Sequence, residues 1–290
     1  MKPLFIAAGS QEWGSSRMRS WWIAPHIRGA SVITFEARSP GFKSLQDLTH
    51  VIWQKNVDLD ILENRRDVKH YWDVCDPAWW WQPERCREIA NNVNGVVASS
   101  QNLAADFNQW YGKDKAICIA DRIDLDKFPY VRHHSDVTPV RFIWFGVAVN
   151  RIAIFGQLVN LERLAANGYK IELTIFDDHP DEELLITNSF PVYHKRWSLG
   201  SESDVLPAHN IALLPPYPGA WGRVKSNNKQ LTAWACGLPV VSDESYYEIK
   251  DLVSDSIMRQ NKSTDNTMEL KKNWLIEKSV AEWEKLLCAS

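Results

Sequence analysis

The fold is decided by residues 210–243, which read NIALLPPYPGAWGRVKSNNKQLTAWACGLPVVSD. Residues 211–214 form an apolar run typical of a short buried strand, and two prolines end it. A loop rich in glycine, proline and cations follows, and residues 229–236 have helical character. Gly237 fits the left-handed position after a helix, and Pro239 begins a second buried strand. This order is half of an open α/β sheet, in which ligands bind at the carboxyl ends of strands.

The loop inside this stretch carries an unusual density of hydrogen-bond donors. Arg223, Lys225 and Lys229 place three cations within seven positions, and Asn227 and Asn228 add neutral donors. Lys229 also begins the predicted helix, whose amino-terminal dipole favours an anion. The pattern predicts a site for a diphosphate, the alternative being a plain basic loop.

The same stretch resembles the donor-site motif K-x-x-E-A/Y-M-A-x-G-x-P-V-V of the large retaining family of GT-B glycosyltransferases. Residues 96–107 and the 123–128 segment resemble two weaker motifs of that family. The resemblance implies a GT-B fold and a nucleotide-sugar donor. One position departs, because Thr232 stands where the family usually has a glutamate that holds the ribose hydroxyls. The matching residues are Lys229, Ala233, Ala235, Gly237, Pro239, Val240 and Val241.

Composition is that of an ordinary globular protein. The chain has 290 residues, 45% of them hydrophobic and 24% charged, and a formal net charge of −3. This charge argues against strong chain-wide affinity for nucleic acid, although it leaves room for a local basic patch. No apolar run approaches the roughly 20 residues that span a bilayer, so we expect no transmembrane segment and a cytoplasmic location. The five cysteines form no CxxC pair, which predicts free thiols.

Strand and helix patterns alternate twice along the chain, which predicts two parallel-sheet domains of an α/β protein. We assign residues 1–128 to an amino-terminal, acceptor-side, Rossmann-like domain and residues 140–262 to a nucleotide-sugar-binding, Rossmann-like domain. Residues 129–139 are polar and rich in turn formers, and we interpret them as the linker. Residues 264–288 predict a terminal amphipathic helix, which in GT-B proteins packs back on the amino-terminal domain. The cleft between the domains is the expected site.

Further candidate residues follow predicted strands. Gly14 and Ser15 lie in the loop after the first strand, which faces the donor phosphates and the acceptor in GT-B enzymes. Arg151 follows the strand that ends at Gly146 and could reach the same phosphates, although a solvated arginine at a helix start is an equal alternative. The resemblance places the nucleotide base near Asp177, Arg196 and Trp197, with Trp197 as the stacking partner. The complete set predicted to bind the donor is Gly14, Ser15, Gly146, Arg151, Asp177, Arg196, Trp197, Tyr217, Gly222, Arg223, Lys225, Asn228, Lys229 and Thr232.

Asp76 is the catalytic candidate, because it ends the fourth predicted strand. It could act as general base in an inverting reaction or bind acceptor hydroxyls in a retaining one, whereas a simple Asp-Pro turn is the alternative. With several cations at hand, no metal is required. Residues 79–81 are three consecutive tryptophans just past this strand, and indoles beside loops suit stacking on sugars or bases.

The sequence thus predicts a metal-independent glycosyltransferase without a bound cofactor. Its co-substrate would be a nucleotide sugar, for which we expect a UDP-sugar, and its acceptor a hydroxyl on a glycan or on a hydroxymethylated base of phage-type DNA. Thr232 favours an alternative, a GT-B-like protein that binds a nucleotide sugar or glycan without turnover. A sugar-nucleotide epimerase would need a Glu/His set that is not identifiable in the sequence. The sequence leaves the oligomeric state, the sugar and the stereochemistry open.

Overall fold

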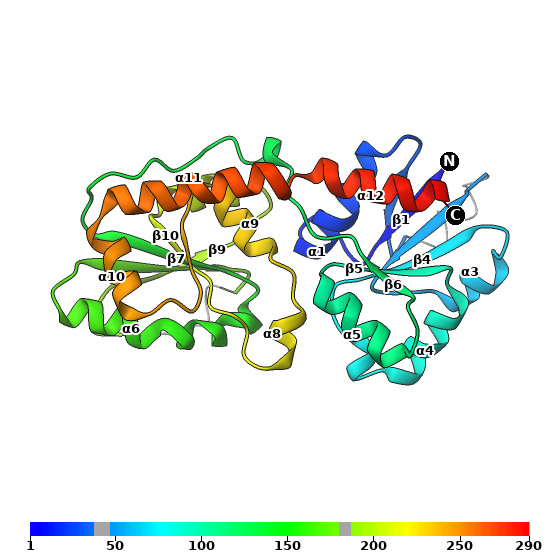
Figure 1. Ribbon diagram of the computed structural model, residues 1–290, viewed down its shortest axis with the longest axis horizontal. Helices are drawn as coiled ribbons and strands as arrows, with labels where there is room; N and C mark the ends of the chain where they lie inside the picture. Colours follow the sequence, from blue (N-terminus) through cyan, green and yellow to red (C-terminus); the bar gives the residue numbers. More distant parts are fainter. Residues whose placement is uncertain (38–46, 180–186, 290) are drawn as a thin grey trace. The chain divides into compact units, whose positions relative to one another are not determined.

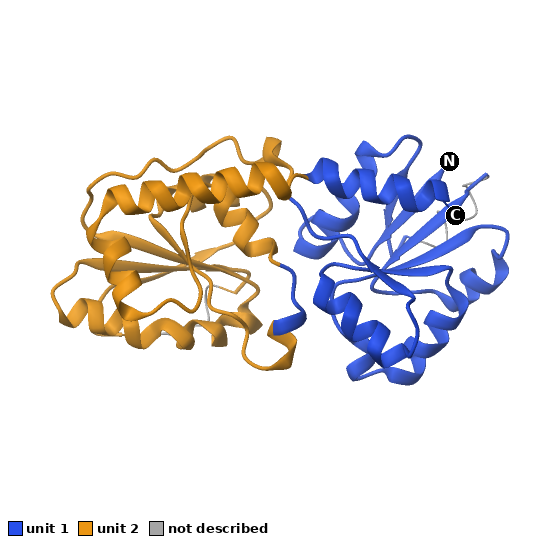
Figure 2. Cartoon of the chain, viewed as in Figure 1, with its two compact units in different colours: residues 1–122, 223–226, 276–290 blue, residues 123–222, 227–275 orange. Residues whose placement is uncertain are grey.

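The computed structural model describes residues 1–37, 47–179 and 187–289. The chain forms two compact units (Figure 2). Unit 1 comprises Met1–Arg122, Arg223–Ser226 and Ile276–Ser290, and unit 2 comprises Ile123–Gly222 and Asn227–Leu275. A four-residue segment of the loop after residue 214 therefore belongs to unit 1, while the chain on either side of it belongs to unit 2.

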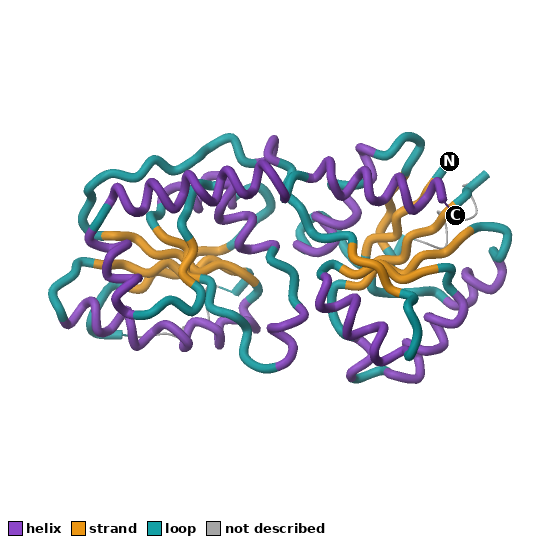
Figure 3. Tube along the Cα trace, in the orientation of Figure 1, coloured by secondary structure: helices purple, strands orange, loops and turns teal. Residues whose placement is uncertain are grey.

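Unit 1 is built on a six-stranded parallel sheet in the order β2-β1-β3-β4-β5-β6. The central strands β1, β3, β4 and β5 are buried along almost their whole length because helices cover both faces (Figure 3). The strand order reverses at β1, since β2 lies on one side of it and β3 on the other. The strands are β1 (Pro3–Ala7), β2 (Ser31–Thr34), β3 (His50–Gln54), β4 (Lys69–Val74), β5 (Gly95–Ala98) and β6 (Ala116–Cys118).

In Figure 1, α1 and α12 lie on one side of this sheet and α3, α4 and α5 on the other. Helix α12 completes the core of unit 1, because Trp283 is buried and meets Phe5 of β1 edge to face, with ring centroids 5.5 Å apart. The helices are α1 (Gly14–Ser16), the π-helix η1 (Arg17–Trp21), η2 (Ala24–His26), α3 (Leu59–Asn64), η3 (Ala78–Trp80), α4 (Pro83–Asn92), α5 (Gln101–Tyr111) and α12 (Ile276–Ala289).

Unit 2 has a five-stranded parallel sheet in the order β11-β10-β7-β8-β9. This order reverses at β7, which lies between β8 and β10. The core beneath it includes Phe142, Trp144 and Leu161, all buried. The strands are β7 (Val140–Gly146), β8 (Ile171–Asp177), β9 (Val192–Arg196), β10 (Ile211–Leu213) and β11 (Val240–Val241).

In Figure 1, α6 and α10 lie on one face of this sheet, and α9 and α11 on the other. The helices are η5 (Ala148–Ile154), α6 (Phe155–Ala166), α7 (Glu202–Val205), η6 (Leu206–Ala208), α9 (Asn228–Ala235), α10 (Tyr246–Ser254) and α11 (Ser256–Asn273); η4 (Leu125–Lys127) precedes the sheet and α8 (Ala220–Val224) spans the change of unit.

Residues 14–26 form only short α, π and 3-10 pieces, and Pro25 interrupts the segment. Two expectations from the sequence differ from the structure. The terminal helix expected over residues 264–288 is two helices, α11 and α12, of which α11 belongs to unit 2 and α12 to unit 1. Residues 129–139, interpreted as a linker, run along unit 2, where the Arg132 amide donates to the Cys236 carbonyl at 2.8 Å. The sequence pattern around residues 44–49 also suggests a short helix; residues 44–46 lie outside the described residues, and residues 47–49 are not helical.

No helix in the described ranges combines the length and the apolar character that crossing a bilayer requires.

Two histidines in unit 2, the buried His209 and the partly buried His134, are held in the neutral form. The Nδ1 of His209 donates to the Val205 carbonyl at 2.9 Å, so its Nε2 accepts from the Thr174 hydroxyl at 2.9 Å. Burial lowers the pKa of His209 to about 4, and it does the same to His134, whose Nε2 lies 2.9 Å from the Gly237 carbonyl. Both groups therefore stabilise the fold above the pKa of an unfolded histidine.

This sets a pH dependence of stability. As the pH falls from about 6.5 toward 4, His209 and His134 bind protons in the unfolded chain but not in the folded one. We expect each of them to lower the free energy of unfolding by up to roughly 3 kcal/mol. His209→Gln should lower the free energy of unfolding at pH 7. On acidification this free energy should then fall less in the variant than in the unmodified protein. Urea unfolding at pH 7 and pH 4.5 measures both. His133→Gln, at an exposed side chain of the same unit, is the control and should follow the unmodified protein. Equal losses in His209→Gln and the unmodified protein would contradict the assignment.

Candidate functional site

Each sheet has one topological switch point, where neighbouring strands are reached by connections running in opposite directions. Open α/β sheets bind ligands in the crevice outside the carboxyl ends of the strands at such a point. In unit 2 the point lies between β7 and β10, and in unit 1 between β1 and β3. The predicted site residues fall in both units, and each set is described by itself.

The switch point of unit 2 brings together Trp144, Gly146 and Lys229. The Lys229 Nζ lies 5.2 Å from the centroid of the buried Trp144 ring, a cation–π geometry. A Cβ atom added to Gly146 would stand 2.5 Å from that Nζ, so the absence of a side chain there makes room for the ammonium group. Lys229 is in the first turn of α9, which adds backbone N–H groups and the positive end of a helix dipole. The predicted pair Gly146 and Lys229 is thus adjacent in the structure, in a setting suited to a phosphate.

Arg151 and Asp177 form a buried ion pair. Both side chains are buried, and the Arg151 guanidinium pairs with both oxygens of the Asp177 carboxylate, with Nη2 2.7 Å from Oδ1. The guanidinium also donates to the His179 carbonyl, and Asp177 accepts from the His179 amide at 3.0 Å. Arg151 is therefore not the solvated arginine that the sequence offered as an alternative, and the ion pair braces the loop that follows Gly146. Contact of Arg151 with the phosphates and of Asp177 with the base stays a prediction.

Arg196 and Trp197 follow the edge strand β9. The Arg196 side chain is exposed and donates to the Asp178 carbonyl at 3.4 Å, and the Trp197 amide donates to the Asp177 carbonyl at 2.7 Å. Trp197 is only partly buried, so its place next to the β8 end agrees with the predicted setting, while stacking on a base stays a prediction.

The remaining donor candidates of unit 2 lie along residues 217–232. Thr232 is buried in α9, and its hydroxyl donates to the Asn228 carbonyl one turn earlier at 2.9 Å. Gly222 is pressed against the backbone of Tyr217, where an added Cβ would meet the Tyr217 carbonyl oxygen at 2.0 Å. This close approach folds the loop tightly ahead of α9.

The switch point of unit 1 contains the loop after β1. Gly14 and Ser15 open α1, and both are partly buried. Trp13 occupies the N-cap position of α1, and its side chain makes no capping hydrogen bond. Ser16 instead ties the loop to β3, since its hydroxyl lies 3.1 Å from the Gly9 amide and 2.8 Å from the Gln54 side-chain oxygen.

Asp76, the catalytic candidate, lies between two lysines of unit 1. Its Oδ2 is 2.8 Å from Lys55 Nζ and its Oδ1 2.6 Å from Lys225 Nζ. Burial by itself would raise the pKa of Asp76, but the two ammonium groups outweigh it and hold that pKa below its usual range. A carboxylate held in this state is a weak proton acceptor. Lys225, predicted to bind the diphosphate, is engaged here with Asp76.

Lys55 was not singled out in the sequence. It follows β3 directly and has a left-handed backbone (φ 61°), which is uncommon for a residue with a side chain. Strain of this kind clusters at functional positions. The sequence feature that could have identified Lys55 is its position immediately after a buried strand.

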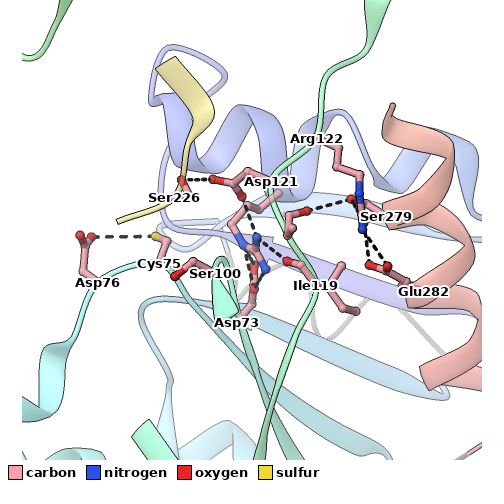
Figure 4. Close-up of polar contacts among 12 residues, drawn as sticks. Asp73, Cys75, Asp76, Ser100, Ile119, Asp121, Arg122, Ser226, Ser279 and Glu282 are labelled. Atoms are coloured by element: carbon pink, nitrogen blue, oxygen red, sulfur yellow. Dashed lines mark hydrogen bonds and ion pairs between the residues drawn. The ribbon is translucent and has the colours of Figure 1, made fainter. Parts of the chain in front are cut away.

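A buried ionic network lies beneath the same edge of the sheet. Arg19 Nε is 2.9 Å from both oxygens of Asp73, and its Nη1 donates to Asp121 at 2.7 Å. The other Asp121 oxygen accepts from the Ser226 hydroxyl at 2.6 Å (Figure 4). Burial, and to a smaller extent the charge of Asp121, raises the pKa of Asp73, although Arg19 opposes this. The network thereby connects the β1, β4 and β6 ends to the 223–226 segment.

Two further hydrogen bonds hold this segment on unit 1. Ser100 at the start of α5 donates to the Val224 carbonyl at 2.7 Å, and Asn102 donates to the Arg223 carbonyl at 2.9 Å. The Arg223 side chain itself is exposed.

Neither a protein-family model nor a curated protein sequence matches this chain. Solved structures do. An alpha-glucosyltransferase (AGT) in complex with UDP superposes with a TM-score of 0.72 at 11% identity, covering 99% of both chains. The chain has the GT-B fold. The same enzyme with UDP and a 13-mer DNA containing an A:G mismatch gives a TM-score of 0.69 at 12% identity, again over 99% of both chains.

Other matched glycosylation proteins are longer. A mutant of TarM from S. aureus gives a TM-score of 0.59 at 12% identity over 82% of this chain. This chain spans only 55% of that protein, and 58% and 54% of two further matched chains. At such identities the likeness establishes the fold alone.

We expect a large loss of stability when the buried Arg151–Asp177 ion pair of unit 2 is broken. Arg151→Met would leave the buried Asp177 carboxylate without its partner, which should cost about 3–5 kcal/mol of unfolding free energy. Arg141→Met is the matched control, because Arg141 in the Arg141–Glu172 pair at 3.4 Å is exposed, so that the pair should be worth less than about 1 kcal/mol. Urea unfolding compares the two variants. Equal small losses would show that Arg151 is not structural.

Filling the space at Gly146 with a side chain should weaken ligand binding while the protein stays folded. In Gly146→Ala the new methyl group would displace the flexible end of Lys229, and we expect the predicted binding of a diphosphate, probed with UDP, to weaken roughly tenfold, the effect of about 1.4 kcal/mol. Gly156→Ala is the control, since its methyl group would meet only Pro215 at an ordinary 3.6 Å. Isothermal titration with UDP and thermal unfolding measure the two effects. Undiminished UDP affinity in Gly146→Ala would remove Lys229 from the ligand site.

Proposed function

We propose that the protein is a glycosyltransferase that moves a sugar from a nucleoside-diphosphate donor to a hydroxyl acceptor. The observation that carries the proposal is the position of Lys229, over Trp144 and against Gly146, in the first turn of α9 at the switch point of unit 2. Departure of the diphosphate builds negative charge, and a fixed cation beside helix N–H groups stabilises such charge. Because a cation already stands at the proposed phosphate site, the proposed reaction needs no metal.

The donor is proposed to be a UDP-sugar and the acceptor a hydroxyl on a modified DNA base. Two structures of an alpha-glucosyltransferase support this, one with UDP and one with UDP and DNA, since both match over nearly the whole length of both chains. A glycan acceptor is the second candidate, supported by the TarM complex that contains UDP and alpha-GlcNAc-glycerol.

Asp76 is proposed to hold the acceptor rather than to abstract its proton. Its lowered pKa makes it a poor general base, whereas an ionised carboxylate accepts hydrogen bonds from hydroxyls well. This role fits a retaining reaction, the stereochemistry that the family resemblance implies.

The alternative is a protein that binds the nucleotide sugar without turnover. The observation favouring it is Thr232, whose buried hydroxyl supplies its proton to the Asn228 carbonyl and which carries no charge for a ribose. Binding without transfer, unaffected by Asp76→Asn, would support this alternative.

The proposal is tested by incubating the purified chain with UDP-sugars and DNA containing 5-hydroxymethylcytosine. We expect release of UDP and a mass increase of the DNA, unchanged by a chelator, and Lys229→Met should lower kcat about 100-fold or more. The Gly156→Ala variant controls for handling, and thermal unfolding shows whether Lys229→Met is folded. Absence of UDP binding, donor hydrolysis and transfer with all common UDP-sugars would refute the function.

A further inference from the structure

Unit 2 contains a cavity at the end of its sheet opposite the switch point. The cavity has a volume of about 470 Å³, and all the residues that line it belong to unit 2. They include Val140, the first residue of β7, whereas the switch point lies beyond Gly146, the last residue of that strand. At about 3.3 Å per residue the two ends of β7 are roughly 20 Å apart, so the cavity is separate from the proposed donor site.

The cavity contains a buried cation, Arg259, which lies in α11 and is 1% exposed. Its Nη1 donates to the Leu252 and Val253 carbonyls at 2.6 and 3.1 Å, and its Nη2 donates to the Ser135 carbonyl at 3.0 Å. A guanidinium has five N–H groups, so at least two of them, the buried Nε–H included, have no partner among the described residues. The three acceptors are neutral carbonyls, which hold the side chain in place without neutralising its charge.

No carboxylate of the described residues forms an ion pair with Arg259. Burial lowers the pKa of Arg259, and the more distant charges of Asp136 and Asp255 only partly oppose this effect. Asp255 caps α11, because its Oδ1 accepts from the Ile257 and Met258 amides at 2.8 and 3.0 Å. A buried charge that lacks a direct counter-ion is costly, and this cost falls when an anion binds beside it.

The other charges around the cavity favour an anion as well. Arg132 also lowers the pKa of Arg259, so the two guanidinium groups are close enough to repel each other, and the Nε of Arg132 is likewise buried without a hydrogen-bond partner. Lys170 lines the cavity with an exposed ammonium group. Asp136, also exposed, is the one acidic residue of the lining, against the two cations Arg259 and Lys170.

The lining fits a phosphate group on a small molecule. A phosphate ester carries a charge of about −1.5 to −2 near pH 7 and three strong acceptor oxygens, whereas a carboxylate carries one charge on two oxygens. Besides the two cations, Thr138 and Tyr169 bring hydroxyl groups to the lining, and neither hydroxyl is bonded to a described residue. The volume is within the range of roughly 300–1,000 Å³ that small-molecule sites occupy.

We infer that unit 2 has a second anion site, in which Arg259 and Lys170 bind the phosphate group of a small molecule at the amino ends of β7 and β8. The inference does not depend on the proposed function, because Lys229 lies at the other end of the sheet. Arg259 holds the last turn of α10 and the carbonyl of Ser135, so an anion that neutralises its charge would stabilise both segments.

Isothermal titration with inorganic phosphate at constant ionic strength tests the site, with acetate as the carboxylate comparison. We expect Arg259→Gln to weaken phosphate binding about tenfold or more, because it removes charged hydrogen bonds from a buried position. Lys170→Met removes an exposed cation and should weaken binding about two- to fivefold. Val137→Trp would fill the cavity, which Val137 lines, and should weaken binding without a change in charge. Lys271→Met, at an exposed lysine of α11 outside the lining, is the matched control and should change nothing.

Lys229→Met separates the two anion sites of unit 2, because it should leave the Arg259-dependent binding of phosphate unchanged. Phosphate binding that is lost in Lys229→Met and kept in Arg259→Gln would overturn the inference. Absence of saturable phosphate binding, or tighter binding of acetate than of phosphate, would also overturn it. Thermal unfolding shows whether Arg259→Gln is folded. If it is not, Lys170→Met and Val137→Trp decide, and an unchanged phosphate affinity in both would overturn the inference.

Discussion

The arrangement of unit 1 depends on one buried cation. Arg19 reaches from the π-helix after β1 to Asp73 at the end of β4, and to Ile119 and Asp121 beyond β6, and all its partners are buried. Removing each such ion from water costs several kcal/mol of free energy. Ion pairing offsets this desolvation cost only when the hydrogen-bond geometry is good and every donor has a partner. The network is therefore weak evidence for stability. It does fix the relative positions of the strand ends, because a shift of any one of them would leave a buried charge unpaired.

Both units solve the same problem with the same topology. A parallel sheet leaves its strand ends facing one edge, and at the strand where the order reverses the flanking loops diverge and leave space. In unit 2 that space is shaped by Gly146 and holds Lys229, while the Arg151–Asp177 pair supports the adjoining loop. In unit 1 the corresponding edge carries Asp76 with its two lysines. The two edges therefore carry different charged groups. The edge in unit 2 presents the Lys229 cation, whereas the edge in unit 1 presents the ionised Asp76 carboxylate between two lysines.

Much of the fold was predictable from the sequence, because buried parallel strands are short apolar runs bounded by turn residues. Gly146 and Lys229 were both assigned to the donor site because they belong to recognisable strand-end and helix-start patterns, whereas their direct contact is visible only in the structure. The ionic partners could not be predicted. Arg151 has the sequence context of a solvated arginine, and only the fold shows that its charge is buried against Asp177. Arg19 meets Asp121 across about a hundred positions of sequence, a separation over which local patterns carry no information.

The path of the chain between the units has a consequence for biosynthesis. Every strand of the first sheet has been made once Cys118 is synthesised, yet the face under Phe5 stays open until α12 arrives after all of unit 2. Unit 2, complete at Leu275, can close its core first, so the order of maturation reverses the order of translation. At about 5–20 residues per second the nascent amino-terminal sheet waits on the order of ten seconds or more. During that interval the face of the sheet that carries Phe5 lacks the cover that Trp283 of α12 provides in the finished protein.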